Sequence, residues 1–176
     1  MSEYFKNFNF NLFWDEDQYS LATYTGTALT EDDVKKAEQE LGYKLPESYI
    51  ELLKNKNGGI PVNRCFATIA ATSWAENHIA INAILGINSH EESLLGELGT
   101  KFMIEEWGYP EIGIIICDCP SAGHDSVMLD YRKCGKDGEP QVVHVDVETD
   151  DKPTVTFLAK DFETFVRGLV NEEDFE

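Results

Sequence analysis

Basic residues are scarce in this sequence, which has 14 lysines and arginines against 33 aspartates and glutamates among 176 residues. The formal net charge of −19 disfavours phosphate backbones and anionic lipid as partners, because both would meet a surface of like charge. We therefore expect no nucleic acid and no membrane as partner, whereas a basic protein or a cation fits. An acidic surface that only keeps the domain soluble is the simpler explanation.

Long apolar runs are also missing, and residues 1–5 lack the basic and apolar parts of a signal peptide. The sequence therefore predicts a cytoplasmic protein. Cysteine occurs only at Cys65, Cys117, Cys119 and Cys134, and the reducing cytoplasm keeps such side chains as free thiols. Four cysteines in a domain of this size do not indicate a disulfide scaffold.

The cysteines and histidines raise the question of a metal site. Cys117 and Cys119 would share one face of a strand, with His124 beyond the next turn, and Cys134 could approach His144. Thiolate and imidazole are suitable zinc ligands, but these spacings are not those of a zinc knuckle. Buried cysteine acting as a small apolar residue explains the pattern, so we expect no metal and no cofactor.

The chain length and a hydrophobic content of 42% suit a single domain with a substantial core. Residues 1–28 are rich in aromatic and acidic side chains, and we expect them to form an arm that packs onto the domain. Residues 29–170 form the domain, and residues 171–176 form an acidic tail. No repeat, low-complexity tract or flexible linker divides the chain.

Two helices are predicted near the beginning of the domain. The first is capped by Thr30, whose three following acidic residues resemble a capping box and complement the helix dipole, and it ends at Gly42. The second begins around Leu45–Glu47, where a proline suits the first helical turn. Gly58 and Gly59 follow it and form a structural turn.

Strand-forming runs dominate the middle of the chain, and short turns separate most of them. The expected strands are residues 79–85, 112–119, 127–131, 142–147 and 155–158. Residues 94–107 have a partly helical pattern, and Asp161 caps a final helix. The fold class is therefore α+β, with N-terminal helices, a mainly antiparallel twisted sheet covered on one face, and a C-terminal helix that packs with the first helices.

Ser121, His124 and Asp125 supply the side chains of a hydrolase triad within one short segment. A triad needs three groups that converge in space, whereas neighbours on a tight turn project in different directions. No G-x-S-x-G elbow accompanies the serine. We therefore predict that the protein is not an enzyme, and that Gly123 and His124 belong to a structural hairpin turn.

Two tryptophans lie close to acidic residues. Trp74 is followed by Glu76, and Glu105 and Glu106 come directly before Trp107. An exposed tryptophan beside an acid is a good interface anchor. A tryptophan packed over the end of the sheet explains either stretch equally well.

Several motifs resemble those of one protein family, the SUKH superfamily, and they occur in the family's order over about residues 29–170. This superfamily includes fungal cell-wall glucan synthesis regulators and many bacterial immunity proteins. The motifs that carry the resemblance are Leu41-Gly42, Leu45-Pro46 with Tyr49, Asn57-Gly58-Gly59, Ser121-Ala122-Gly123-His124-Asp125 with the strand after it, and Phe157-Leu158-Ala159 with Phe162 and Phe165.

The resemblance implies a helix–sheet–helix fold without catalytic residues. In bacteria it implies a protein that binds and neutralises a polymorphic toxin, often a nuclease, so the expected partner is a basic protein toxin. A non-enzymatic regulatory module related to the cell-wall synthesis regulators is the alternative, and the oligomeric state stays open. Under the toxin hypothesis the predicted contact residues lie in loops near strand ends and are Trp74, Glu76, Glu105, Glu106, Asp118 and Asp125.

Overall fold

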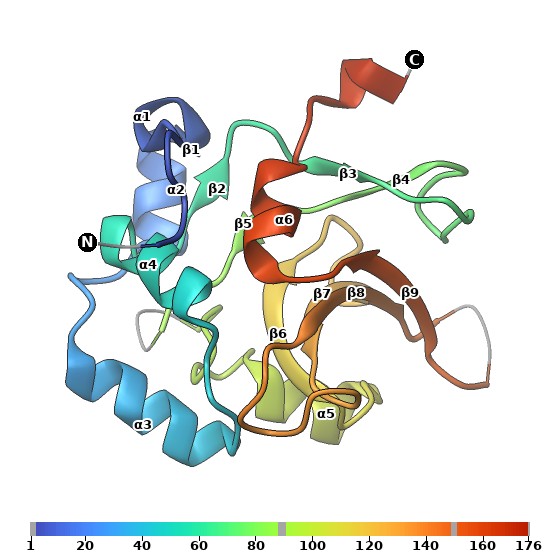
Figure 1. Ribbon diagram of the computed structural model, residues 1–176. Coiled ribbons are helices and arrows are strands. Elements are labelled where there is room, and N and C mark those ends of the chain that lie inside the picture. The colour runs from blue at the N-terminus through green and yellow to red at the C-terminus, as the bar shows by residue number, and fades with distance from the viewer. Residues whose placement is uncertain (1–2, 88–90, 149–150, 176) are drawn as a thin grey trace.

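The computed structural model describes residues 3–87, 91–148 and 151–175, and its centre is a five-stranded antiparallel sheet (Figure 1). Strands that follow one another along the chain are also neighbours in the sheet. Short connections join β6 to β9 in this order, whereas the connection from β5 to β6 is long and contains a helix. The predicted α+β class is confirmed. The five strands are β5 (Ala83–Ile84), β6 (Gly113–Asp118), β7 (Asp125–Asp130), β8 (Gln141–Asp146) and β9 (Thr154–Ala159).

Two smaller antiparallel pairs flank the main sheet. β1 (Trp14–Asp15) pairs with β2 (Ile60–Pro61), and β3 (Cys65–Ala67) pairs with β4 (His78–Ala80). The first pair joins the beginning of the chain to the segment that follows the second long helix. The second pair is a hairpin whose loop carries Trp74.

The apolar run at residues 79–85, predicted as one strand, is divided between β4 and β5, which belong to different sheets. The chain changes partners between them. The N–H of Ile81 donates to the carbonyl of Arg64 at 2.8 Å, and the N–H of Asn82 donates to the carbonyl of Asp118 at 2.7 Å. Both halves of the run are buried, so the apolar pattern could not locate the bend.

Helices lie at both ends of the chain and between β5 and β6. They are α1 (Phe10–Phe13), α2 (Gln18–Thr23), α3 (Glu31–Leu41), α4 (Glu47–Asn55), α5 (Thr100–Trp107), α6 (Phe162–Arg167) and the 3-10 helix η1 (Glu172–Phe175). In the part of the chain that the structure describes, none of them has the length and apolar character needed to cross a bilayer.

The ends of these helices follow the capping chemistry of the sequence. Thr30 and Asp33 form a reciprocal capping box at the start of α3, with N–H to side-chain oxygen distances of 3.0 and 3.1 Å, and Gly42 ends α3 with φ at 80°. Asp161 caps α6 as predicted. Only the second half of the stretch at 94–107 is helical, because α5 begins after Gly99.

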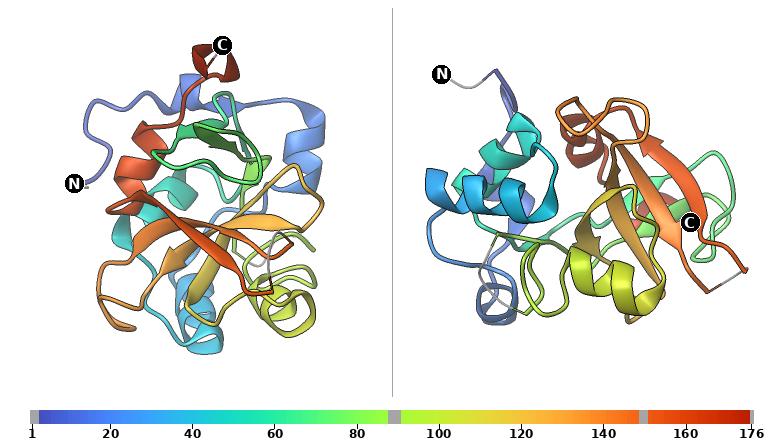
Figure 2. Two further views of the ribbon diagram at one scale, coloured as in Figure 1. Left: turned by 90° about the vertical axis from the view of Figure 1, so that its right-hand side faces the viewer. Right: turned by 90° about the horizontal axis from the view of Figure 1, so that it is seen from below.

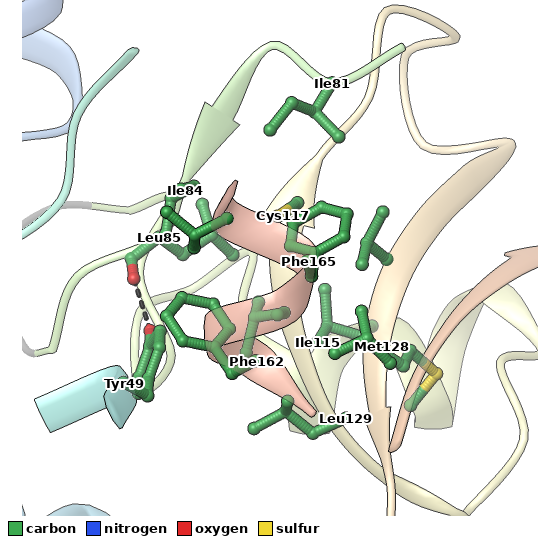
Figure 3. Close-up of a cluster of buried hydrophobic side chains, with 14 of the residues drawn as sticks. Tyr49, Ile81, Ile84, Leu85, Ile115, Cys117, Met128, Leu129, Phe162 and Phe165 are labelled. Atoms are coloured by element: carbon green, nitrogen blue, oxygen red, sulfur yellow. Dashed lines mark hydrogen bonds between the residues drawn. The ribbon is translucent and has the colours of Figure 1, made fainter. Parts of the chain in front are cut away.

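The core lies between α4, α6 and one face of the sheet (Figure 3). Tyr49 of α4 and Phe162 of α6 pack edge to face, with ring centroids 5.0 Å apart. The buried hydroxyl of Tyr49 donates to the carbonyl oxygen of Leu85, the residue after β5. Phe165 is fully buried in the same cluster. The first and last parts of the domain are therefore packed together over the sheet.

α5 lies on the opposite side of the sheet from α6 (Figures 1 and 2). The hydroxyl of Thr100, at its first turn, accepts a hydrogen bond from the N–H of Ile115 in β6 at 3.0 Å. The hydroxyl of Tyr109, just after α5, donates to the carbonyl of Gly123 at 2.8 Å. Helix α5 is thus hydrogen-bonded to β6, and the residue after it to the β6–β7 turn. It lies over the second face of the sheet, in addition to the face that the terminal helices were predicted to cover.

A buried asparagine joins three segments of the chain at the end of α4. The side-chain amide of Asn57 donates to the carbonyls of Thr27 and Ile87 at 3.0 and 3.2 Å, and its oxygen accepts from the N–H of Ile87 at 2.8 Å. Gly58 has φ at 91°, and a Cβ there would overlap the carbonyl oxygen of Tyr24. The turn after α4 is therefore a close crossing that only glycine permits.

Apart from Tyr19, which is 64% exposed, the aromatic residues of segment 3–28 pack against the core. Phe5, Phe13 and Trp14 are buried with the core residues, and the indole N–H of Trp14 donates to the side-chain oxygen of Asn55 at 2.9 Å. This segment lies beside α4 and β2 in Figure 1.

Truncation of Phe162 tests the α6 anchor. We expect Phe162→Ala to lower the free energy of unfolding by about 3–5 kcal/mol, because it leaves a cavity between α6 and α4. Phe157→Ala is the matched control, since the Phe157 side chain is 55% exposed on β9 and its loss should cost less than about 1 kcal/mol. Urea unfolding followed by circular dichroism measures both, and equal losses would contradict the role given to Phe162.

Candidate partner-binding surface

Two of the three tryptophans are exposed in this acidic protein. Trp14 is buried, whereas Trp74 in the β3–β4 loop is 42% exposed and Trp107 at the end of α5 is 40% exposed. Large aromatic side chains are costly to leave in water and are enriched among the residues that dominate protein interfaces. The surroundings of Trp74 and Trp107 are therefore the candidate partner-binding surface.

Each exposed tryptophan lines a hollow in the surface. The Trp74 hollow has a volume of about 350 Å³ and includes Arg64 and Glu172 in its lining. The Trp107 hollow has a volume of about 410 Å³ and lies between α5 and the ends of β6 and β7. Asn82 and Pro120 line both, so the two hollows adjoin and form one continuous surface.

The β6–β7 turn holds Trp107 in place. Gly123 has φ at 98°, and the three atoms nearest to a Cβ built there all belong to the Trp107 ring, which such a Cβ would overlap. The hydrogen bond from Tyr109 to the Gly123 carbonyl fixes the chain just beyond the helix. His124 lies beside the same indole, with ring centroids 6.4 Å apart. Gly123 therefore makes room for one wall of the Trp107 hollow.

The polar groups of this turn are arranged for support and not for nucleophilic catalysis. The Ser121 hydroxyl donates to Asp125 Oδ1, and Asp125 Oδ2 lies 2.6 Å from Nε2 of the buried His144. The carboxylate thus stands between the serine and the histidine, whereas a triad needs the histidine in the middle. His124 is outside this group, with its Nδ1 2.9 Å from a Glu148 oxygen at the surface.

Asp125 is therefore an internal residue and not part of the exposed surface. Its side chain is buried, and both of its oxygens are engaged by Ser121 and His144. Its place in a loop near a strand end had predicted it as a partner contact. The pairing of β7 with β8, which brings His144 beside it, depends on strand register and was not visible in the local sequence.

The Trp107 hollow has an acidic end. Asp118 lines it and accepts hydrogen bonds from the Tyr24 hydroxyl at 3.1 Å and the Asn82 amide at 3.4 Å. Glu92 lines it too, and burial raises the pKa of both carboxyl groups. Burial and the nearby Asp118 and Glu92 also raise the pKa of Tyr24. Glu92 belongs to no periodic pattern, so the sequence did not single it out.

The other predicted residues lie around this surface or away from it. Glu76 is exposed in the β3–β4 loop two residues after Trp74, and Glu105 and Glu106 are exposed on α5 just before Trp107, but none of the three lines a hollow. Gly58 and Gly59 lie after α4, where Gly59 packs close to the Trp14 ring. Trp74 and Asp118 are thus the predicted contacts that the fold places within the surface.

The cysteines are apolar packing residues in this structure. Cys117 and Cys119 are fully buried, and burial raises the pKa of both thiols well above the usual range. Cys65 is buried as well, and Cys134 is partly buried. Within residues 3–87, 91–148 and 151–175, no three histidine, cysteine or acidic side chains come together as a metal site would require.

The partly buried carboxyl group of Asp118 should make stability depend on pH. Its pKa is raised by burial and by the charge of Asp125, against hydrogen bonds from Tyr24 and Asn82, so the folded state favours the protonated form. The free energy of unfolding therefore falls as pH rises from the unfolded pKa through the raised folded pKa, because the carboxyl group becomes charged over this range. We expect Asp118→Asn to raise the melting temperature at neutral pH and to have no effect at pH values below both.

Thermal unfolding as a function of pH measures this effect. Glu76→Gln is the matched control, because it removes an equal charge from an exposed loop position and should leave the melting temperature unchanged at both pH values. A lower melting temperature of Asp118→Asn at neutral pH would show that the Asp118 carboxylate stabilises the free domain.

Gly123→Ala tests the support of Trp107. The alanine would be strained by the positive φ and would also displace the indole, so we expect a loss of about 1–3 kcal/mol together with a changed Trp emission spectrum. Gly135→Ala is the control, because its φ is also positive but nothing lies within 4 Å of the added Cβ. It should lose stability without a spectral change. Identical spectra for the two variants would rule out the proposed contact.

Comparison with known proteins gives one result. The model of the SMI1/KNR4 family (SUKH-1) matches residues 28–168, which include all helices and strands from α3 to α6. Searches of curated proteins and of solved structures gave no match. The match covers most of the chain and agrees with the motifs that resemble SUKH proteins. The chain therefore belongs to the SMI1/KNR4 family (SUKH-1).

Proposed function

We propose that this protein is an immunity protein that binds and neutralises a basic protein toxin through the Trp74 and Trp107 hollows. The observation that carries the proposal is the pair of exposed tryptophans at adjoining hollows in a domain with a net charge of −19. Membership of a family that includes toxin immunity proteins supports it. The protein would act by binding alone, in the cytoplasm and without a cofactor.

Charge complementarity favours a nuclease-type toxin. A protein that acts on nucleic acid carries a basic surface, because it must attract phosphate groups. The same surface is attracted to an acidic inhibitor, and such steering raises association rates by roughly 10- to 1,000-fold at low salt. An acidic immunity protein would therefore reach its toxin quickly and compete with the nucleic acid for the same charges.

The exposed tryptophans would supply most of the binding energy. Hot-spot residues are typically large aromatic side chains near the centre of an interface, surrounded by polar groups that exclude water. Trp74 and Trp107 are large exposed aromatic side chains of this kind, and under the proposal the exposed acids Glu76, Glu105 and Glu106 would form the surrounding rim. Rim charges contribute more to association rate and specificity than to affinity.

Capture followed by a rescue assay tests the proposal. The tagged protein is used to isolate partners from the lysate of its own organism, and each captured protein is expressed in a heterologous host with and without this chain. We expect one captured basic protein to be toxic alone and harmless when co-expressed, and its binding to weaken as salt is raised. Capture only of non-toxic cell-wall synthesis proteins would overturn the immunity role in favour of a regulatory module.

Two alanine variants test the surface. Trp74→Ala and Trp107→Ala should each weaken toxin binding by about thirtyfold or more in calorimetry, as expected for a hot-spot aromatic residue. Leu12→Ala is the matched control, because Leu12 is 75% exposed on α1 and outside both hollows. Unchanged affinity of both tryptophan variants for a captured toxin would place the interface elsewhere.

A further inference from the structure

We propose that the Trp107 hollow holds one lysine or arginine side chain of the protein partner, with its aliphatic part along α5 and its charged head at Glu92 and Asp118. The inference rests on the proposed function in that it assigns the chemistry of one contact within that interface. Three observations support it: the apolar walls of the hollow, the unpartnered Glu92 oxygen at its end, and the different charges of the two hollows.

The walls suit the methylene chain of a basic residue. Leu98, Phe102, Met103 and Trp107 line the side of the hollow formed by α5 and the segment before it. Leu98 and Trp107 are substantially exposed, so part of this wall is in contact with water in the free protein. Lysine and arginine bury their carbon stems on such surfaces, and a guanidinium or ammonium group is also attracted to an indole face.

The inner end of the hollow offers one carboxylate oxygen without a donor. Glu92 Oε2 is buried, and no hydrogen-bond partner for it is present among the residues that the structure describes. Asp118 and Glu92 line this end together, and Asp118 already shares the proton of the Tyr24 hydroxyl, whose pKa is raised by burial and by the charges of both acids. A single hydroxyl has one proton to donate, whereas an ammonium has three donors and a guanidinium five. A basic side chain would satisfy both acids.

The two hollows differ in charge. The lining of the Trp74 hollow contains a cation of its own, Arg64, as well as the acidic Glu172. The lining of the Trp107 hollow includes two acids and no lysine, arginine or histidine within the described residues, and neither acid takes part in an ion pair there. Two partly buried carboxyl groups without an internal cation favour a cation from outside. The mainly apolar lining disfavours a hydrated metal ion and an anion.

Nuclear magnetic resonance with a single-residue probe tests the inference without the toxin. The 176-residue chain has three tryptophans and therefore three indole N–H signals, which Trp107→Phe and Trp74→Phe assign. Nα-acetyl-arginine amide is titrated to millimolar concentrations, and the uncharged Nα-acetyl-citrulline amide serves as the isosteric control. We expect the arginine probe to shift the Trp107 signal, citrulline to leave it in place, and the Trp14 signal to stay fixed because that indole is buried and bonded to Asn55.

Paired charge variants separate the hollow from the general acidity of the protein. The double substitution Glu92→Gln with Asp118→Asn should abolish the Trp107 shift. Asp32→Asn with Glu40→Gln removes the same charge from exposed positions on α3 and should preserve the shift. No shift with the arginine probe, an equal shift with citrulline, or an equal loss in both double variants would overturn the inference.

A captured toxin gives a second and independent test. The Glu92→Gln and Asp118→Asn pair should weaken toxin binding by about thirtyfold or more, and the arginine probe should compete with the toxin. Toxin binding that is unaffected by the pair and by the probe would overturn the contact while leaving the immunity function in place. A Trp107 shift with no toxin among the captured proteins would overturn the immunity function while leaving the cation site in place.

Discussion

The buried side chain of Asn57 is the interaction on which the arrangement of this domain depends. It binds the backbone of Thr27 on one side and of Ile87 on the other, while Gly58 lets the chain pass close to the carbonyl of Tyr24. The crossing holds the N-terminal segment, the end of α4 and the segment after β5 in one place. An amide has both donors and an acceptor, which an apolar side chain could not supply to three backbone groups.

That crossing also determines the acidic end of the Trp107 hollow. Tyr24, which donates to Asp118, belongs to the segment that contacts Gly58 and Asn57. Glu92 lies five residues after Ile87, which is hydrogen-bonded to Asn57. Groups that are far apart in the sequence therefore meet at one phenol. Keeping two carboxyl groups partly buried there opposes folding, because burial disfavours their charged form. Sites kept for binding are commonly less than optimal for stability, and these acids fit that pattern.

Local chemistry made much of the fold predictable. The capping box at Thr30, the stop at Gly42, the cap at Asp161 and the hairpin strands from β6 to β9 each depend on residues within a few positions of one another. The division of residues 79–85 and the pairing of Asp125 with His144 depend on register and on contacts across the fold, which composition and periodicity do not encode. For the candidate surface, sequence patterns indicated Trp74 and Asp118. They missed Glu92, whose position depends on a loop, and misplaced Asp125.

Trp107 of the candidate surface is supported by Gly123 of the β6–β7 turn and not by the residues of the main core. The indole is supported by a glycine in a turn, and the neighbouring Glu105 and Glu106 are exposed and therefore under little packing constraint. Substitutions there would leave α6, α4 and the sheet as they are. Under the proposed immunity function, substitutions at these positions would change binding specificity around Trp107 while the scaffold stays the same.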